Sequence, residues 1–156
     1  MNGIEGAGGG HGWEQNLVDD DARIAQIVRS AKRVAVLGIK TEAERDQAAF
    51  YVPEYLGAHG VEIVPVPVYY PDAREILGKP VLRRVVDAGL PLDIVDVFRR
   101  PKDVAAHVDD LLAARPAVVW LQLGIRDDAS AERLARAGII VVQDRCLLVE
   151  HRRYVR

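Results

Sequence analysis

Residues 32–41 read KRVAVLGIKT, and this stretch decides the fold. A short apolar run that ends in glycine is typical of a strand buried on both faces of a parallel sheet. Similar short apolar runs follow along the chain, at residues 61–67, 92–98, 117–121 and 139–142. Together the runs predict about five strands.

Helical patterns separate these runs. The acidic residues 19–21 offer an N-cap, after which the apolar side chains at 24–31 fall on one helical face. Further helices are predicted at 47–59, at 101–114 and at 129–137, and Pro53 inside the first of them marks a late start or a kink. A weaker segment, 75–88, is expected to hold a short strand near Val81. This alternation predicts an α/β fold, a Rossmann-like three-layer sandwich with a mostly parallel sheet.

Length and composition narrow the class of protein. The 156 residues fit one domain, expected at residues 17–156 after a flexible, glycine-rich lead at 1–16. A formal net charge of −2 argues against nucleic-acid binding, and no apolar run approaches the ~20 residues of a membrane span. The glycine-rich start does not resemble a secretory signal, so a cytoplasmic location is expected.

Several kinds of chemistry lack their usual residues. Cys146 is the single cysteine, which excludes an intramolecular disulfide and a CxxC pair. The sequence has no HExxH motif and no G-x-S-x-G elbow, so neither a metal site nor a catalytic residue is predicted. The basic end, residues 151–156, is expected to be a solvated tail rather than a phosphate clamp.

In an open α/β sheet, ligands bind beyond the carboxyl ends of the strands, and the residues at those ends favour a phosphorylated ligand. The loop Gly38–Thr41 combines a flexible glycine with a lysine and a hydroxyl, which favours a phosphate. The end of the second strand, residues 66–70, lacks the carboxylate that holds the ribose of NAD. Arg99 and Arg100 follow the third strand, where they favour either a phosphate or surface ion pairs.

The strings VDVFR at 95–99, WLQLG at 120–124 and DRC at 144–146 occur in this order along the chain. As a set they resemble the small single-domain CoA-binding proteins, which are similar to the CoA-binding domain of the succinyl-CoA synthetase alpha subunit. The resemblance covers about residues 30–150. It implies a CoA or acyl-CoA ligand, with phosphates at residues 38–41, adenine beside 66–67, and a cleft lined by 98–99 and 122–124. The implied cofactor-binding residues are Gly38, Ile39, Lys40, Thr41, Val66, Pro67, Phe98, Arg99, Gln122 and Gly124.

The resemblance favours a non-catalytic module that binds a small nucleotide-containing molecule. The synthetase needs a further domain with a phosphorylated histidine, for which this chain has no room. One alternative is a small NADP-dependent oxidoreductase, because Arg99 or Arg100 could accept the 2′-phosphate. Another alternative is an interaction protein with a degenerate cleft, whose contacts would be Trp13, Tyr69, Tyr70 and Tyr154. No protein partner or oligomeric state is predicted.

Overall fold

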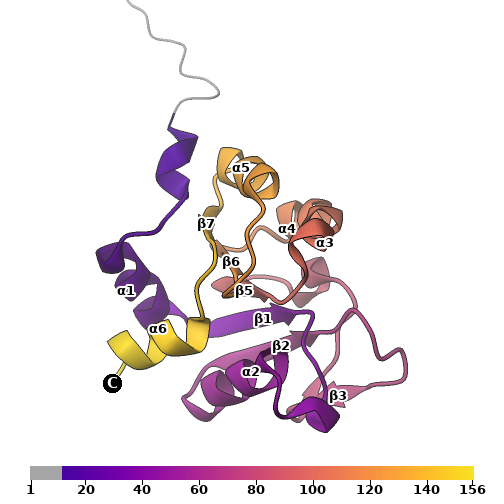
Figure 1. Ribbon diagram of the computed structural model, residues 1–156. Helices are drawn as coiled ribbons and strands as arrows, with labels where there is room; N and C mark the ends of the chain where they lie inside the picture. Colours follow the sequence, from indigo (N-terminus) through magenta and orange to yellow (C-terminus); the bar gives the residue numbers. More distant parts are fainter. Residues whose placement is uncertain (1–11) are drawn as a thin grey trace, which may run out of the picture.

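The computed structural model describes residues 12–156, which form a parallel sheet covered by helices (Figure 1). The sheet has five strands in the order β2-β1-β5-β6-β7, and every neighbouring pair is parallel. This confirms the predicted α/β fold. The strands are β1 (Arg33–Leu37), β2 (Glu62–Val66), β5 (Ile94–Val97), β6 (Val118–Leu121) and β7 (Ile140–Val142).

The strand order reverses next to β1. The chain moves outward from β1 to β2 and then returns across β1 to begin β5 on its other side. Val36 in β1 therefore pairs with Pro65 of β2 and with Asp96 of β5. A reversal of this kind leaves a crevice beyond the carboxyl ends of the strands, because the two connecting segments leave in opposite directions.

Helices cover both faces of the sheet (Figure 1). One face packs against α1 (Asp21–Ser30), α2 (Ala48–Ala58) and α6 (Leu147–Tyr154). The other packs against α3 (Pro101–Val104), α4 (Val108–Ala114) and α5 (Asp128–Arg136). Short 3₁₀ turns complete the set: η1 (Trp13–Asn16), η2 (Glu42–Glu44), η3 (Val85–Ala88) and η4 (Ala105–His107).

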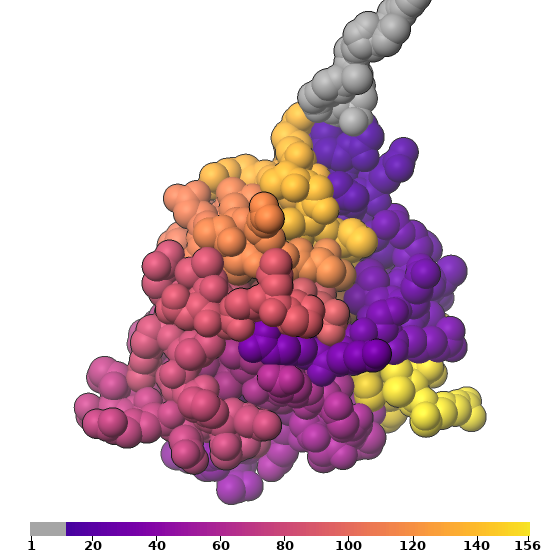
Figure 2. Space-filling view, turned by 180° about the vertical axis from the view of Figure 1, so that it is seen from behind, coloured from indigo at the N-terminus to yellow at the C-terminus, as the bar shows by residue number. Residues whose placement is uncertain are grey.

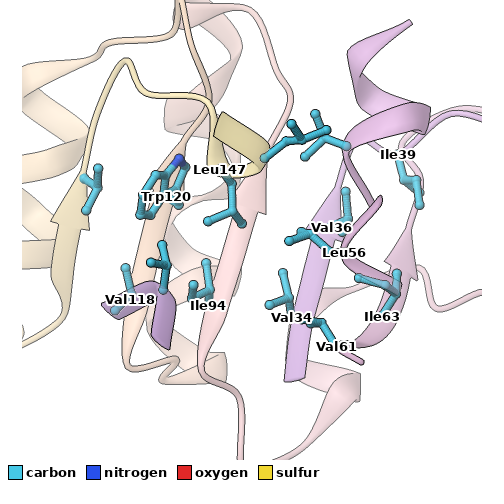
Figure 3. Packing of buried hydrophobic residues seen from close by; sticks show 14 of the residues in the cluster. Val34, Val36, Ile39, Leu56, Val61, Ile63, Ile94, Val118, Trp120 and Leu147 are labelled. Atoms are coloured by element: carbon cyan, nitrogen blue, oxygen red, sulfur yellow. The ribbon is translucent and has the colours of Figure 1, made fainter. Parts of the chain in front are cut away.

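The core divides into two apolar layers because strand side chains alternate between the faces. Val34, Val36, Ile94 and Trp120 lie together in the layer under α2 and α6 (Figure 3). The exception on this face is Asp96, which is fully buried, and neither of its oxygens has a hydrogen-bond partner among residues 12–156. Burial raises the pKa of this carboxyl well above its usual range.

Two local predictions differ from the structure. The second helix begins at Ala48, so Pro53 lies inside α2 and a late start is wrong. The segment 75–88 contains an antiparallel pair, β3 (Glu75–Ile76) and β4 (Lys79–Pro80), and then the turn η3. The short strand expected near Val81 thus ends one residue before it.

The basic end of the chain is not a solvated tail. Residues 147–154 form α6, which packs against α1, and His151 is buried. Tyr55 of α2 places its hydroxyl 3.2 Å from Nδ1 of His151. The prediction was wrong because Leu147, Leu148 and His151 lie on one side of a helix, so α6 packs while Arg152 and Arg153, which follow them, stay exposed.

Part of the predicted flexible lead belongs to the packed domain. Residues 1–11 lie outside the described residues. The turn η1 packs against α5, where the Asn16 side chain donates a hydrogen bond to the Ala135 carbonyl at 2.8 Å. Arg136 lies over the Trp13 ring, 4.8 Å from its centroid. The described end of the lead is therefore attached to the sheet domain.

Candidate functional site

A cavity of about 660 Å³ opens beyond the carboxyl ends of the strands. Its lining comes from the segments that follow β1, β2, β5 and β6, together with the first turn of α2. The segments that follow β2 (magenta) and β5 (rose) lie next to each other on the face seen in Figure 2. The lining residues are Gly38, Lys40, Gln47, Ala48, Ala49, Val68, Tyr69, Tyr70, Phe98, Arg99, Arg100, Pro101 and Ile125.

Gly38 lies where the strand order reverses, and its position demands glycine. Its φ of +86° is in the left-handed region, and its N–H donates to the Val66 carbonyl at 2.8 Å. A Cβ here would collide with the carbonyl oxygen of Phe98 and come within 3.4 Å of Cδ of Arg99. The missing side chain therefore lets the segment after β5 cross directly over the end of β1.

Lys40 is fixed beside the first turn of α2 by a proline in that helix. Pro53 has no N–H, so the carbonyl of Ala49, four residues earlier, is left without its helical donor. The backbone N–H of Lys40 donates to this carbonyl instead, at 3.1 Å. The lysine is thereby held next to the positive end of the helix.

The first turn of α2 contributes further positive potential. Gln47 precedes the helix without a side-chain cap, and Ala48 and Ala49 line the cavity. The first N–H groups of an α-helix have no acceptor inside the helix and carry a partial positive charge. Such a helix end favours a bound anion.

Arg99 and Tyr69 form another part of the cavity wall. The guanidinium of Arg99 lies 5.7 Å from the centroid of the Tyr69 ring. A hydrogen bond from Arg99, reinforced by its charge, lowers the pKa of the Tyr69 phenol. The Tyr69 side chain remains exposed at the cavity mouth, which leaves its ring open to a planar ligand group.

The loop that carries Tyr69 is held by one arginine. Arg83 donates to the carbonyl oxygens of Tyr69, Tyr70, Pro71 and Ala73 at distances of 2.8–3.3 Å. Tyr70 also has a positive φ, 65°, which is unusual for a side chain of its size. These bonds satisfy carbonyl groups that would otherwise need water and keep the loop against the cavity.

The charges of the lining have one sign. Lys40, Arg99 and Arg100 are present together with the end of α2, and none of the lining residues is Asp or Glu. Asp103 lies behind this wall, where its carboxylate accepts from Nε of Arg100 at 2.7 Å, which lowers the pKa of Asp103. The cavity therefore presents positive potential and apolar or aromatic surface to a ligand.

The structure brings four of the ten predicted site residues to this cavity: Gly38, Lys40, Phe98 and Arg99. Four of the other six are buried, and three of these are apolar. Ile39 lies in the core under α2 (Figure 3), and Val66 and Pro67 are also inside the fold. The adenine border expected at 66–67 is replaced in the lining by the next residues along, Val68–Tyr70.

The remaining three predicted residues do not line the cavity and make contacts within the fold. Thr41 caps η2, where its hydroxyl accepts from the N–H of Ala43. Gln122 is buried, and its Oε1 accepts from the N–H of Leu147, the first residue of α6, at 3.0 Å. The N–H of Gly124 donates to Oδ1 of Asp144 at 2.7 Å. Each of these polar groups thus has a structural partner.

Sequence reasoning did not select the first turn of α2, Val68–Tyr70, Arg100, Pro101 or Ile125 as site residues. The segments after the second and third strands are candidate ligand contacts by sequence, but the residues expected in the second end at Pro67, just before the part that lines the cavity. The α2 contribution had a usable signal, because a helix start that follows a glycine loop after a buried strand is a standard anion site.

A crevice at a strand reversal, a helix end and a positive lining are features with which α/β domains bind phosphorylated ligands. A family model described as "CoA binding domain" matches residues 32–152. The chain therefore belongs to the CoA-binding domain family, as its sequence motifs had indicated.

Relatives of known sequence or structure support this assignment. The uncharacterized protein YneT of Bacillus subtilis is 30% identical over 130 residues, covering 83% of this chain and 93% of YneT. The structure of cell-free ID.343 from Thermus thermophilus is 39% identical, with a TM-score of 0.79, and covers 87% of this chain and 99% of its own. A hypothetical protein from Pyrococcus horikoshii is 30% identical, with a TM-score of 0.78, and covers 88% of this chain and 94% of its own.

A larger enzyme shares the fold alone. A dinucleotide-forming acetyl-coenzyme A synthetase from Ca. Korarchaeum cryptofilum is similar with a TM-score of 0.57 at 18% identity. The similarity covers 70% of this chain but 25% of the synthetase chain.

Among residues 12–156 no helix is long and apolar enough to span a membrane, and no cluster of His, Cys, Asp and Glu is arranged for a metal ion.

Proposed function

We propose that this protein binds CoA or an acyl-CoA in the cavity beyond β1, β2 and β5, as a binding module without a catalytic step. The observation that carries the proposal is the convergence of Lys40, Arg99 and the first turn of α2 on one cavity. Family membership agrees with the ligand, and the positive lining agrees with a molecule that carries a pyrophosphate and a 3′-phosphate.

The geometry suggests how the ligand would lie. The pyrophosphate would occupy the end of α2 next to Lys40, where free N–H groups and the helix dipole favour negative charge. Arg99 would hold the 3′-phosphate, since a guanidinium can donate two parallel hydrogen bonds to phosphate oxygens. Val68 and the exposed Tyr69 ring would contact the adenine by stacking and apolar contact.

The lining also supports a role in binding rather than in chemistry. It contains no carboxylate, imidazole, thiol or aliphatic hydroxyl among the described residues. General acid–base catalysis and acyl transfer usually depend on such groups within hydrogen-bond reach of the substrate. The lining side chains are therefore better suited to binding an acyl-CoA than to cleaving its thioester.

Calorimetric titration with CoA, acetyl-CoA, dephospho-CoA, NAD and NADP tests the proposal. Wild-type protein should bind CoA and acetyl-CoA similarly, and dephospho-CoA more weakly, because it lacks the group assigned to Arg99. Lys40→Ala and Arg99→Ala should each weaken CoA binding by about 10–150-fold, the effect of losing a charged hydrogen bond of about 1.5–3 kcal/mol.

Matched controls separate local from general effects. Lys32→Ala and Arg133→Ala remove charges that do not line the cavity, and both should leave CoA affinity unchanged. Tight NADP binding without a response to CoA would replace the proposal by the oxidoreductase alternative. If none of the five compounds binds, the alternative of an interaction protein with a degenerate cleft would be favoured.

A further inference from the structure

Arg99 differs from the other cations of the cavity because its guanidinium is hydrogen-bonded to the imidazole of His107. Its side chain is 15% exposed, whereas that of the adjacent Arg100 is 68% exposed. Nε of Arg99 donates a hydrogen bond to Nε2 of His107 at 3.1 Å. His107 does not line the cavity itself.

The position of His107 makes it a fixed support. It ends the turn η4, between α3 and α4, and is partly buried. Its Nε2 can accept the Arg99 hydrogen bond only when the ring is neutral and carries its proton on Nδ1. A protonated ring has donors on both nitrogens and cannot accept.

The terminal nitrogens of Arg99 have two neighbours in the protein. The Tyr69 hydroxyl accepts a hydrogen bond from Arg99, and one terminal nitrogen lies 3.9 Å from Oδ2 of Asp103. That same oxygen accepts from Nε of Arg100 at 2.7 Å, so Arg100 is the closer partner of the carboxylate. With its Nε bound to His107, Arg99 still has terminal N–H donors for an anion in the cavity.

Charged groups from three directions surround the His107 ring. Arg99 approaches from the segment after β5, Asp103 from α3 and Asp110 from α4. Burial and then the Arg99 charge lower the pKa of His107, while the two carboxylates act in the opposite direction. The net result is a pKa below the usual value of about 6.5, so the ring is a neutral acceptor at pH 7.

We infer that His107 is a positioning residue whose neutral imidazole holds Arg99 in the orientation that presents its terminal N–H groups to a phosphate of the ligand. This inference rests on the proposed function. Protonation of His107 removes the acceptor and places a second cation against Arg99. Phosphate binding should therefore weaken as pH falls through the pKa of His107, because Arg99 is pushed away from its support.

A double-mutant cycle tests whether His107 acts through Arg99. His107→Leu should weaken CoA binding about tenfold, as expected for one hydrogen bond to a charged group. His107→Gln should bind like wild type, because its amide oxygen can accept from Nε. In an Arg99→Ala background, His107→Leu should have no further effect. An equal loss in both backgrounds would overturn the inference, and His59→Gln, at the exposed residue that follows α2, is the control.

The pH dependence provides a readout that a purely structural role would not change. Phosphate groups of the ligand also titrate near pH 6, so wild type is compared with His107→Gln at pH 7.5 and pH 5.5. The ratio of the two affinities cancels the titration of the ligand. Wild type should lose affinity relative to the glutamine variant at the lower pH. A relative gain would show that the imidazolium itself attracts the phosphate, which contradicts the positioning role.

A measurement without ligand keeps this inference separate from the proposed function. Imidazole NMR of the free protein should find the His107 proton on Nδ1 and a pKa that rises in Arg99→Ala. If wild type binds no CoA, the proposed function fails while this titration still decides whether His107 supports Arg99. A proton on Nε2, or a pKa indifferent to Arg99, would overturn the inference.

Discussion

The loops that follow β1 and β6 turn at Gly38 and Gly124, and both glycines have a φ of 86°. Their surroundings differ. A Cβ on Gly38 would collide with the backbone of Phe98, whereas a Cβ on Gly124 would meet no described heavy atom within 4 Å. In the first loop Gly38 lies under the segment after β5 and lines the cavity, whereas in the second loop Gly124 is exposed and only the next residue, Ile125, reaches the cavity.

The two loops also differ in how their polar groups are satisfied. After β6, the N–H of Gly124 donates to Asp144, and the side chain of Gln122 accepts from the start of α6. After β1, the first turn of α2 lines the cavity and keeps N–H groups without a helical acceptor. A glycine at a strand end therefore does not identify a binding loop; unsatisfied donors facing a cavity do.

The largest expected effect is on Gly38. Gly38→Ala should lower the free energy of unfolding by about 2–5 kcal/mol, from a positive φ and a collision with backbone that has no room to move. Gly124→Ala should cost about 1–2 kcal/mol, because the φ penalty acts there alone. Urea unfolding followed by circular dichroism measures both. Equal losses would remove the distinction between the two glycines.

Asp96 lies in β5, between β1 and β6, the strands that precede the two loops. Its burial should lower the stability of the fold without involving either loop. Its folded pKa is raised by burial, so its contribution to stability is fully present below the unfolded pKa of about 3.9 and is lost as pH rises toward the folded pKa. The free energy of unfolding of wild type, relative to Asp96→Asn, should fall by about 1.4 kcal/mol per pH unit in that window.

Unfolding of both proteins at pH 4.5, 5.5 and 6.5 measures this difference. Between pH 4.5 and 6.5 the difference should therefore grow by up to about 3 kcal/mol, at about 1.4 kcal/mol per pH unit. A difference that does not change between these pH values would mean that Asp96 is ionised in the folded protein, in conflict with its burial.

The smallest effect is expected at Gln122, where stability and binding should separate. Gln122→Ala should lower the free energy of unfolding by about 1–2 kcal/mol, because the N–H of Leu147 loses its acceptor. CoA affinity should stay within about twofold of wild type, since Gln122 does not line the cavity. A large loss of affinity with normal stability would make Gln122 part of the site.

Several residues show why the site was less predictable than the fold. Lys40 and Arg99 were recognisable because charged residues stood directly after apolar strands. Gln122 was also conspicuous, as an amide after the most continuous strand, yet its partner is the backbone of Leu147, 25 residues further on. Thr41 resembled a phosphate contact and instead caps the turn η2. A polar residue in a loop has the same signature whether it bonds to a ligand or to the protein.

The C-terminal helix illustrates the same limit. Residues 151–156 are dominated by arginines, which favoured a solvated end. Packing against α1 and α2 makes α6 part of the fold, and Arg145, just before the helix, is bonded to Asp19 at 3.0 Å. This ion pair joins residues 126 apart in the sequence, which no local pattern reveals.

By itself the sequence determined the sheet and its parallel sense, because the periods of apolar residues depend on which faces of each element are buried. It also determined the family, through motifs at the strand ends. The tertiary structure alone decided which of those strand-end residues meet in one cavity. That outcome depends on contacts between segments: Phe98 crossing over Gly38, the bond from Lys40 to the Ala49 carbonyl left free by Pro53, and the support of Arg99 by His107.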